Sequence, residues 1–176
     1  SGSYGVPGDK FTAIIGSDGS GIIEAIGQDV SGFSVGDRVV YGNGPMGSYC
    51  QARLMPAEFV LKLPDEISFE TASAMMVKGM TAQYLLRQSY EVKAGDTVLI
   101  QAAAGGVGLI MTQWAKHIGA TVIGTVGTEE KSELAKSCGC DHTINYKTED
   151  FPDRVRELTN GVGVDVAYDG VGKATF

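Results

Sequence analysis

The amino-acid sequence predicts an α/β protein in which a small β domain precedes a doubly wound parallel sheet. Three observations carry this prediction. Residues 1–63 are rich in glycine and contain short apolar runs separated by turn residues, which is typical of a small, mostly antiparallel β domain. From residue 97 onward, strand-like and helix-like segments alternate, as they do in parallel βαβ units. The first of these strands leads into a glycine-rich turn at residues 102–108.

The size and composition of the chain are those of a globular protein with one large or two small domains. It has 176 residues, of which 43% are hydrophobic and 20% are charged. The net charge of −7 and the lack of clustered Lys and Arg argue against a nucleic-acid partner. No membrane span is expected, because no run of about 18 apolar residues occurs. Residues 1–10 do not resemble a signal peptide, and the missing initiator Met indicates processing or a piece of a longer protein.

The first domain is expected to contain four short strands. Their apolar runs are bounded by glycine-containing turns such as Val35 to Asp37 and Gly42 to Pro45. Such turns are typical of hairpins between antiparallel strands. The four strands are expected at residues 21–26, 37–41, 49–54 and 58–63.

The pattern then becomes helical. Ser68 is a suitable N-cap residue, and a helix is expected to run from it through about Met76. A second helical stretch is expected from Thr81 to Gln88, with leucines on one face. We therefore place the domain boundary near Val77, which gives domains of residues 1–77 and 78–176.

The second domain alternates strands and helices in a regular order. Four strands can be recognised, whereas a complete doubly wound dinucleotide domain has six, in the order 3-2-1-4-5-6. The sequence therefore predicts a partial sheet of this type, whose strands 5 and 6 are missing. The strands are expected at residues 97–101, 121–126, 142–145 and 164–169, and the helices at 107–118, 129–138 and 150–159.

The glycine-rich turn predicts a binding site for a pyrophosphate group. Residues 98–100 form a short apolar run, as in a strand buried on both faces. When the following turn is aligned with the Rossmann fingerprint Gly-x-Gly-x-x-Gly, Ala103 takes the first position, Gly105 the second and Gly108 the third. The turn opens a helix, whose N–H groups and dipole attract an anion. A purely structural turn is the alternative for the glycines considered alone.

The end of the second strand of this domain indicates which dinucleotide binds. In NAD-dependent proteins an Asp or Glu at this point binds the ribose 2′-hydroxyl. Here Gly127 leaves room for a 2′-phosphate, and Lys131 can supply a positive charge. NADPH is therefore favoured over NADH. Glu129 and Glu130 complicate this inference, although acids are common in the first turn of a helix, and Lys131 can also be an ordinary solvated lysine.

Two further segments follow strands of the predicted sheet. Tyr146 comes directly after the third strand and can cover the same phosphate or the adenine with its ring and hydroxyl, or simply pack at the strand end. Residues 169–172 end the fourth strand at the edge where ligands of open α/β sheets bind, and a simple loop is the alternative for them.

The sequence does not favour a metal site or an acid–base catalyst. Cys138 and Cys140 lie near His142, but one Cys pair and one His are better explained as small, half-buried residues leading into a strand. His117 and His142 are expected to pack or to lie at the surface. Together with Cys50, the cysteines form no even disulfide framework, so a cytoplasmic protein is expected.

Four segments together resemble the zinc-independent quinone oxidoreductases, the zeta-crystallin-like branch of the medium-chain dehydrogenase/reductase superfamily. They are residues 78–81, 102–108, 124–128 with Lys131, and 144–146. The resemblance covers the whole chain and implies a partial GroES-like catalytic domain before a partial Rossmann domain that binds NADPH. The cofactor-binding positions it implies are Tyr4, Ala104, Gly105, Gly106, Val107, Gly127, Lys131 and Tyr146.

The same resemblance implies hydride transfer from NADPH to quinones or to activated α,β-unsaturated carbonyls. Alcohol dehydrogenases of the superfamily carry a zinc-ligating histidine where this chain has Ser17, so no metal is expected. No catalytic residue is identified, and the full-length protein is expected to be a homodimer. Because the chain lacks parts of both family domains, a non-catalytic NADPH-binding or interaction module is the alternative function.

Overall fold

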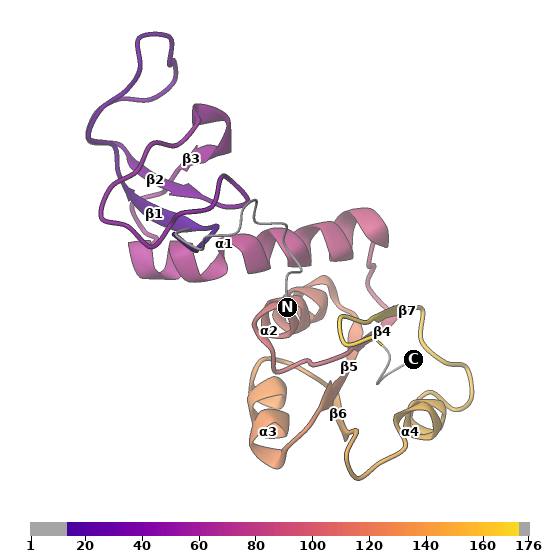
Figure 1. Cartoon of the computed structure of the whole chain (residues 1–176). Coiled ribbons are helices and arrows are strands. Elements are labelled where there is room, and N and C mark those ends of the chain that lie inside the picture. The colour runs from indigo at the N-terminus through magenta and orange to yellow at the C-terminus, as the bar shows by residue number, and fades with distance from the viewer. Residues whose placement is uncertain (1–13, 173–176) are drawn as a thin grey trace. The chain divides into compact units, whose positions relative to one another are not determined.

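The computed structural model describes residues 14–172, and the chain divides into two compact units, residues 1–77 and 78–176 (Figure 1). Each unit has a hydrophobic core of its own. In the first unit the core gathers around Val40, Leu63 and Ala72. In the second unit, two larger clusters of buried side chains lie on the two faces of the parallel sheet.

The first unit contains a three-stranded antiparallel sheet in the order β1-β2-β3. Its strands are β1 (Gly19–Ile22), β2 (Arg38–Tyr41) and β3 (Val60–Lys62), and the 3-10 turn Ala57–Phe59 leads into β3. The antiparallel β character expected of this half is confirmed. The strands are shorter than expected, and β1 begins at Gly19, before the run expected at 21–26, and ends within that run at Ile22.

The prediction of a strand at residues 49–54 is wrong, because this segment is an irregular loop. Arg53 folds the loop back on itself. Its Nη2 donates to the carbonyl oxygen of Pro45 at 2.7 Å, and its Nη1 donates to Ser48 Oγ at 3.1 Å. The guanidinium also lies 5.2 Å from the ring centre of Tyr41. Through Nη2, Arg53 thus satisfies the carbonyl groups of Pro45 and Met46 without a neighbouring strand.

One continuous helix replaces the two helical stretches that were expected. Helix α1 (Phe69–Tyr84) runs through residues 77–80 and continues as the π-helical turn Leu85–Ser89. Ser68 caps its start, since Ser68 Oγ accepts from the N–H of Thr71 at 3.1 Å. Gly79 within the helix costs only about 1 kcal/mol relative to Ala, which packing of the helix flanks offsets.

The second unit has a four-stranded parallel sheet in the order β6-β5-β4-β7. Numbered along the domain, this is the order 3-2-1-4 of a doubly wound fold, so the expected fold class is confirmed. The strands are β4 (Thr97–Ile100), β5 (Thr121–Val126), β6 (His142–Asn145) and β7 (Val166–Tyr168). The helices are α2 (Gly106–Ile118), α3 (Glu129–Ser137) and α4 (Phe151–Leu158).

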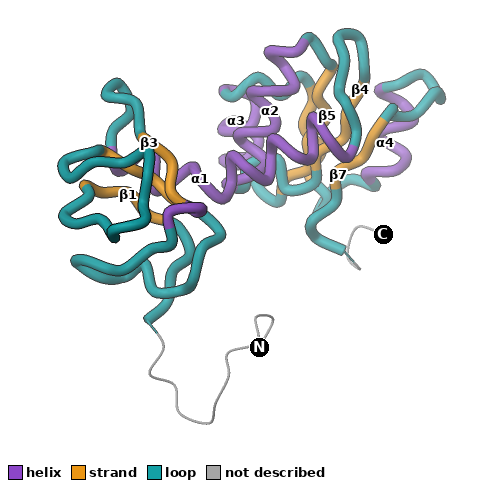
Figure 2. Tube along the Cα trace, turned by 90° about the horizontal axis from the view of Figure 1, so that it is seen from above, coloured by secondary structure: helices purple, strands orange, loops and turns teal. Residues whose placement is uncertain are grey.

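Helices α2 and α3 lie on one face of the sheet and α4 on the other (Figures 1 and 2), and alternate strand residues pack against different helices. Val98 and Val122 pack with buried residues of α2 and α3 and with the C-terminal part of α1. Leu99 and Ile123 pack instead with α4. Both faces are therefore covered, as parallel sheets require. Within the described residues no helix is long and apolar enough to cross a membrane.

Cys140 is buried in the core of the second unit. Its Sγ donates to the carbonyl oxygen of His142 at 3.0 Å, and burial raises the pKa of the thiol to about 11. The thiolate is the species that reacts with alkylating agents, and at pH 8 roughly one thiol in a thousand would be ionised. We therefore expect iodoacetamide to label the exposed Cys50 and the half-buried Cys138 well before Cys140. Peptide mass spectrometry measures this order, and labelling of Cys140 at the rate of Cys50 would contradict it.

Candidate cofactor site at the carboxyl edge of the sheet

The glycine-rich turn joins β4 to α2 through a sharply bent backbone. Ala102 has a φ of 53°, in the left-handed region that non-glycine residues rarely adopt. The N–H of Gly105 donates to the carbonyl oxygen of Ala102 at 2.8 Å, and the N–H of Leu109 donates to that of Gly105 at 2.8 Å. The bond from Leu109 is the first of the helix. The N–H groups of residues 106–108 lie in the first helical turn, where the helix offers them no acceptor.

The glycines of the turn stand where a side chain would collide with its neighbours. A Cβ at Gly108 would lie 2.5 Å from the carbonyl oxygen of Ala102 and 2.7 Å from that of Ala103. A Cβ at Gly106 would lie 2.8 Å from Cδ and Cε of Lys78. Gly108 thus lets α2 approach the turn closely, which is the role of the third glycine in the fingerprint. The stem of Lys78 beside Gly106 is a contact that the sequence did not predict.

The first turn of α2 is suited to an anion. It contains no acidic side chain, so nothing in it neutralises the positive end of the helix dipole. Gly105 and Gly106 are exposed, and Ala104 and Val107 are half-buried. The backbone at these four predicted positions is therefore close to solvent, and glycine at two of them lets a phosphate approach the N–H groups.

Thr125 on β5 holds the turn in place. The N–H of Ala102 donates to Thr125 Oγ1 at 3.2 Å, and the N–H of Ala103 donates to the carbonyl oxygen of Thr125 at 3.0 Å. The same hydroxyl donates to Gln101 Oε1, and both polar side chains are buried. Neither Thr125 nor Gln101 was expected to support the turn, and the only signal in the sequence was a polar residue near the end of each predicted strand.

Replacing Thr125 by Val is expected to lower the free energy of unfolding by about 1–3 kcal/mol, because the Gln101 amide oxygen and the Ala102 N–H lose their partner. Val has nearly the same shape, so packing is kept. Thr125→Ser, which keeps the hydroxyl, is the matched control and should be the more stable of the two variants. Urea denaturation measures both, and equal stability of the Val variant and the parent would show that the hydroxyl does not hold the turn.

A second group of predicted residues lies past the ends of β5 and β6. Gly127 follows β5, and a Cβ there would lie 2.6 Å from Tyr146 Oη, so the phenol stands directly over the glycine. The N–H of Tyr146 donates to the carbonyl oxygen of Val126 at 3.2 Å. Tyr146 as a whole remains 49% exposed. The structure therefore brings Gly127 and Tyr146 together and leaves the phenol available to a ligand.

Lys131 lies in the first turn of α3, the helix that begins just after the end of β5. The N-cap residue Thr128 accepts a hydrogen bond from the N–H of Lys131 at 3.3 Å, which fixes the start of the helix. The lysine is exposed, as are Glu129 and Glu130 beside it. Since the carboxyl ends of parallel strands meet at one edge, the glycine-rich turn, Gly127, Lys131 and Tyr146 all follow strand ends at that edge.

The other residues considered from sequence take ordinary positions. His117 and His142 are exposed, and Ser17 is half-buried ahead of β1. The Asp169 carboxylate accepts from the N–H groups of Val171 at 2.7 Å and of Gly172 at 3.0 Å, an Asx turn. Tyr4 lies outside the described residues. Within residues 14–172, no group of three or more His, Cys, Asp or Glu side chains is arranged to hold a metal ion.

Comparison with protein families agrees with this arrangement. Residues 1–65 match the alcohol dehydrogenase GroES-like domain, and residues 106–176 match the family described as zinc-binding dehydrogenase. The chain therefore belongs to the medium-chain dehydrogenase/reductase superfamily. Within that superfamily, its sequence and structure group with the quinone oxidoreductases.

Individual relatives are similar over nearly the whole chain. A 2-haloacrylate reductase of Burkholderia is 53% identical over 165 residues, covering 93% of this chain and 50% of the relative. A quinone oxidoreductase of Pseudomonas aeruginosa is 49% identical over 176 residues, covering 100% of this chain and 54% of the relative. The chain thus spans about half the length of the curated relatives it matches.

Solved structures give the same result. A quinone oxidoreductase of Pseudomonas syringae pv. Tomato superposes with a TM-score of 0.93 at 49% identity, covering 97% of this chain and 53% of the other. The Escherichia coli quinone oxidoreductase complexed with NADPH superposes with a TM-score of 0.92 at 44% identity, covering 98% of this chain and 52% of the other.

Proposed function

We propose that this chain belongs to an NADPH-dependent reductase that transfers a hydride to quinones or to activated α,β-unsaturated carbonyls without zinc. The observation that carries the proposal is the group at the end of β5, where the Tyr146 phenol stands over Gly127 and Lys131 opens the next helix. This group offers a hydroxyl and a positive charge, with no carboxylate at the strand tip. Those features suit the 2′-phosphate that distinguishes NADPH from NADH.

The pyrophosphate would bind at the start of α2. The N–H groups of residues 106–108 and the positive end of the helix dipole favour the negative charge, and Gly105 and Gly106 allow close approach. Ala104 and Val107 contribute backbone to the same turn. Tyr4 is proposed, by resemblance to the family, to reach the nicotinamide end. The bound nicotinamide would supply the hydride, and the protein would align it with the acceptor and exclude water.

The names of the relatives support the proposed class of acceptor. Among them are enzymes named quinone oxidoreductase and 2-haloacrylate reductase. Quinones and activated enones accept a hydride with less help than a simple ketone, which suits a site without a Lewis acid. The zinc-ligating histidine of the superfamily's alcohol dehydrogenases is replaced by Ser17, and a serine hydroxyl is a much weaker zinc ligand.

We also propose that the full-length protein is a cytoplasmic homodimer. The three cysteines are free thiols, which supports a reducing compartment. Light scattering of the purified full-length protein would test the oligomeric state.

Titration with the two nucleotides tests the proposal. The purified protein should bind NADPH at least tenfold more tightly than NADH, and 1,4-benzoquinone should then oxidise the bound NADPH, followed as loss of absorbance of the reduced nicotinamide. A preference for NADH would overturn the assignment of the 2′-phosphate group. Tight NADPH binding without oxidation in the full-length protein would favour the non-catalytic alternative.

The variant Lys131→Ala should weaken NADPH binding about tenfold and leave NADH binding unchanged within about twofold, since only NADPH carries the phosphate that pairs with the ammonium. Lys136→Ala is the matched control. It removes the same charge from the last turn of the same helix, where Lys136 pairs with Glu133 at 2.9 Å. Fluorescence titration of the parent and both variants with each nucleotide measures six dissociation constants, and equal losses of NADPH and NADH binding in Lys131→Ala would contradict a phosphate contact.

A further inference from the structure

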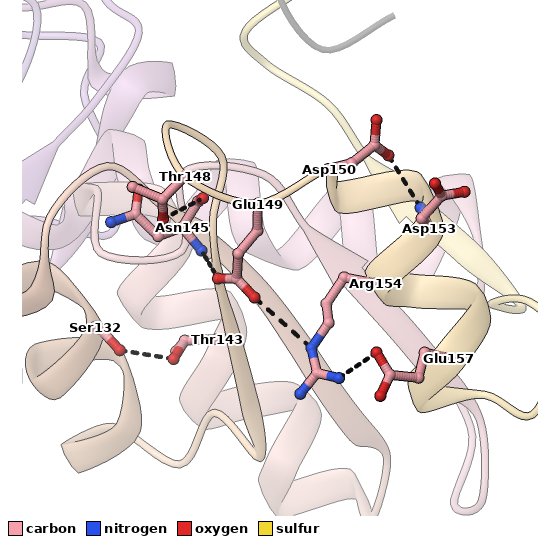
Figure 3. A network of polar contacts seen from close by, with 9 residues as sticks. All are labelled: Ser132, Thr143, Asn145, Thr148, Glu149, Asp150, Asp153, Arg154 and Glu157. Carbon is pink, nitrogen blue, oxygen red and sulfur yellow. Dashed lines mark hydrogen bonds and ion pairs between the residues drawn. The ribbon is translucent and has the colours of Figure 1, made fainter.

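The loop that carries Tyr146 is held by side chains on either side of it (Figure 3). The N–H of Asn145 donates to Glu149 Oε1 at 2.8 Å, and the N–H of Lys147 donates to Asn145 Oδ1 at 3.1 Å. Between them, the N–H of Tyr146 donates to Val126 on β5 at 3.2 Å. Three successive N–H groups are therefore fixed, and the middle one belongs to the tyrosine.

Glu149 closes this loop onto Asn145. The carbonyl oxygen of Asn145 accepts from the N–H groups of Thr148 at 3.0 Å and Glu149 at 2.9 Å, so the backbone turns back on itself. The carboxylate of Glu149 then returns to the N–H of Asn145. A carboxylate is a strong acceptor, so this bond ties the end of the loop to its start.

Helix α4 holds the Glu149 carboxylate through Arg154. Glu149 Oε2 lies 3.7 Å from Arg154 Nε, and Arg154 Nη1 lies 2.5 Å from Glu157 Oε2 (Figure 3). The arginine also offsets the negative charge of Glu149, which would otherwise repel a phosphate bound beside Tyr146. The network thus links α4, through Glu149, to the backbone of the loop that carries the Tyr146 side chain.

We propose that Glu149 is a positioning residue for cofactor selectivity, because it holds the Tyr146 phenol over Gly127, beside the place where the 2′-phosphate of NADPH would bind. This inference rests on the proposed function. Glu149 itself does not touch the phosphate. Its contribution is the direction of the phenol, so its loss should affect NADPH and spare NADH, which has no 2′-phosphate.

Two substitutions separate the hydrogen bond from the charge. Glu149→Ala removes both, whereas Glu149→Gln removes the charge and keeps an oxygen that can accept from the N–H of Asn145. Asp153→Ala is a charge-matched control on α4, where Asp153 pairs with the exposed Arg156 at 2.6 Å. Dissociation constants for NADPH and NADH are measured by fluorescence titration of the purified protein, and amide hydrogen exchange is followed in the nucleotide-free protein.

We expect Glu149→Ala to raise the NADPH dissociation constant about fivefold, with that of NADH unchanged within about twofold. Exchange at residues 145–147 should become faster. Glu149→Gln and Asp153→Ala should both resemble the parent. Equal weakening of both nucleotides by Glu149→Ala, or no change in NADPH binding, would overturn the positioning role.

The outcome also distinguishes this inference from the function on which it rests. If the parent prefers NADPH and Tyr146→Phe reduces that preference, the phosphate assignment stands whatever Glu149 does. Parent-like selectivity of Glu149→Ala then overturns the positioning role alone. If the parent shows no preference for NADPH, the phosphate assignment fails, and the positioning role fails with it.

Discussion

The variant Gly108→Ala is expected to lose nucleotide binding and about 3 kcal/mol of unfolding free energy. The new Cβ would lie 2.5 Å and 2.7 Å from the carbonyl oxygens of Ala102 and Ala103. Those atoms are backbone, and the turn that carries them is held by Thr125 on the neighbouring strand. Because they cannot move aside cheaply, α2 must shift away from β4. The shift carries the N–H groups of the first helical turn out of the position proposed for the pyrophosphate.

Denaturation in urea and titration with NADPH measure the two effects. Gly170→Ala is the matched control for stability in the same unit, because a Cβ at Gly170 meets no atom within 4 Å. We expect that control to change stability by less than about 1 kcal/mol. If Gly108→Ala matched it in stability and still bound NADPH, the close approach of α2 to the turn would not be required.

The parallel sheet was predictable because its signals are local. Residues 98–100 are a short apolar run, which predicted a strand buried between two helical layers, and residues 121–126 follow in the regular alternation of strands and helices. The glycines then marked where the chain turned into α2. The same reasoning placed Gly127 and Tyr146 after strand ends, and parallel topology brings strand ends to one edge.

The errors arose where side chains reach distant backbone. Residues 49–54 alternate polar and apolar side chains and therefore resembled a strand, but Arg53 uses its guanidinium to hold carbonyl groups of residues 45 and 46. Periodicity carries no information about such a contact. Likewise two helical stretches were expected, one ending near Met76 and one starting at Thr81, but packing of side chains before and after residues 77–80 keeps α1 continuous.

Supporting residues of the candidate site were hidden for the same reason. Gln101 and Thr125 are 24 positions apart, and their contact exists only because β4 and β5 pair in register. Glu149 lies in a polar loop where an exposed carboxylate has no distinguishing pattern. The residues proposed to contact the cofactor could be named from motifs, whereas those that position them required the fold.

Gly127→Asp is expected to raise the NADPH dissociation constant at least about 100-fold. A carboxylate near the 2′-phosphate would cost about 4 kcal/mol, taking two unit charges 4 Å apart at an effective dielectric constant of 20. The side chain would also displace the Tyr146 hydroxyl, which lies 2.6 Å from the position of the new Cβ. NADH should bind equally well or better, because an Asp at this strand end can accept from the ribose 2′-hydroxyl.

Gly127→Ala separates displacement of the phenol from the added charge. Its methyl group also meets Tyr146 Oη, but this atom is the far end of a side chain that is half-exposed and can swing aside. Folding should therefore change by less than about 1 kcal/mol, and NADPH binding should weaken only about tenfold. Fluorescence titration of both variants with both nucleotides gives the comparison. If Gly127→Asp weakened NADPH and NADH by the same factor, the end of β5 would not be where the two cofactors are told apart.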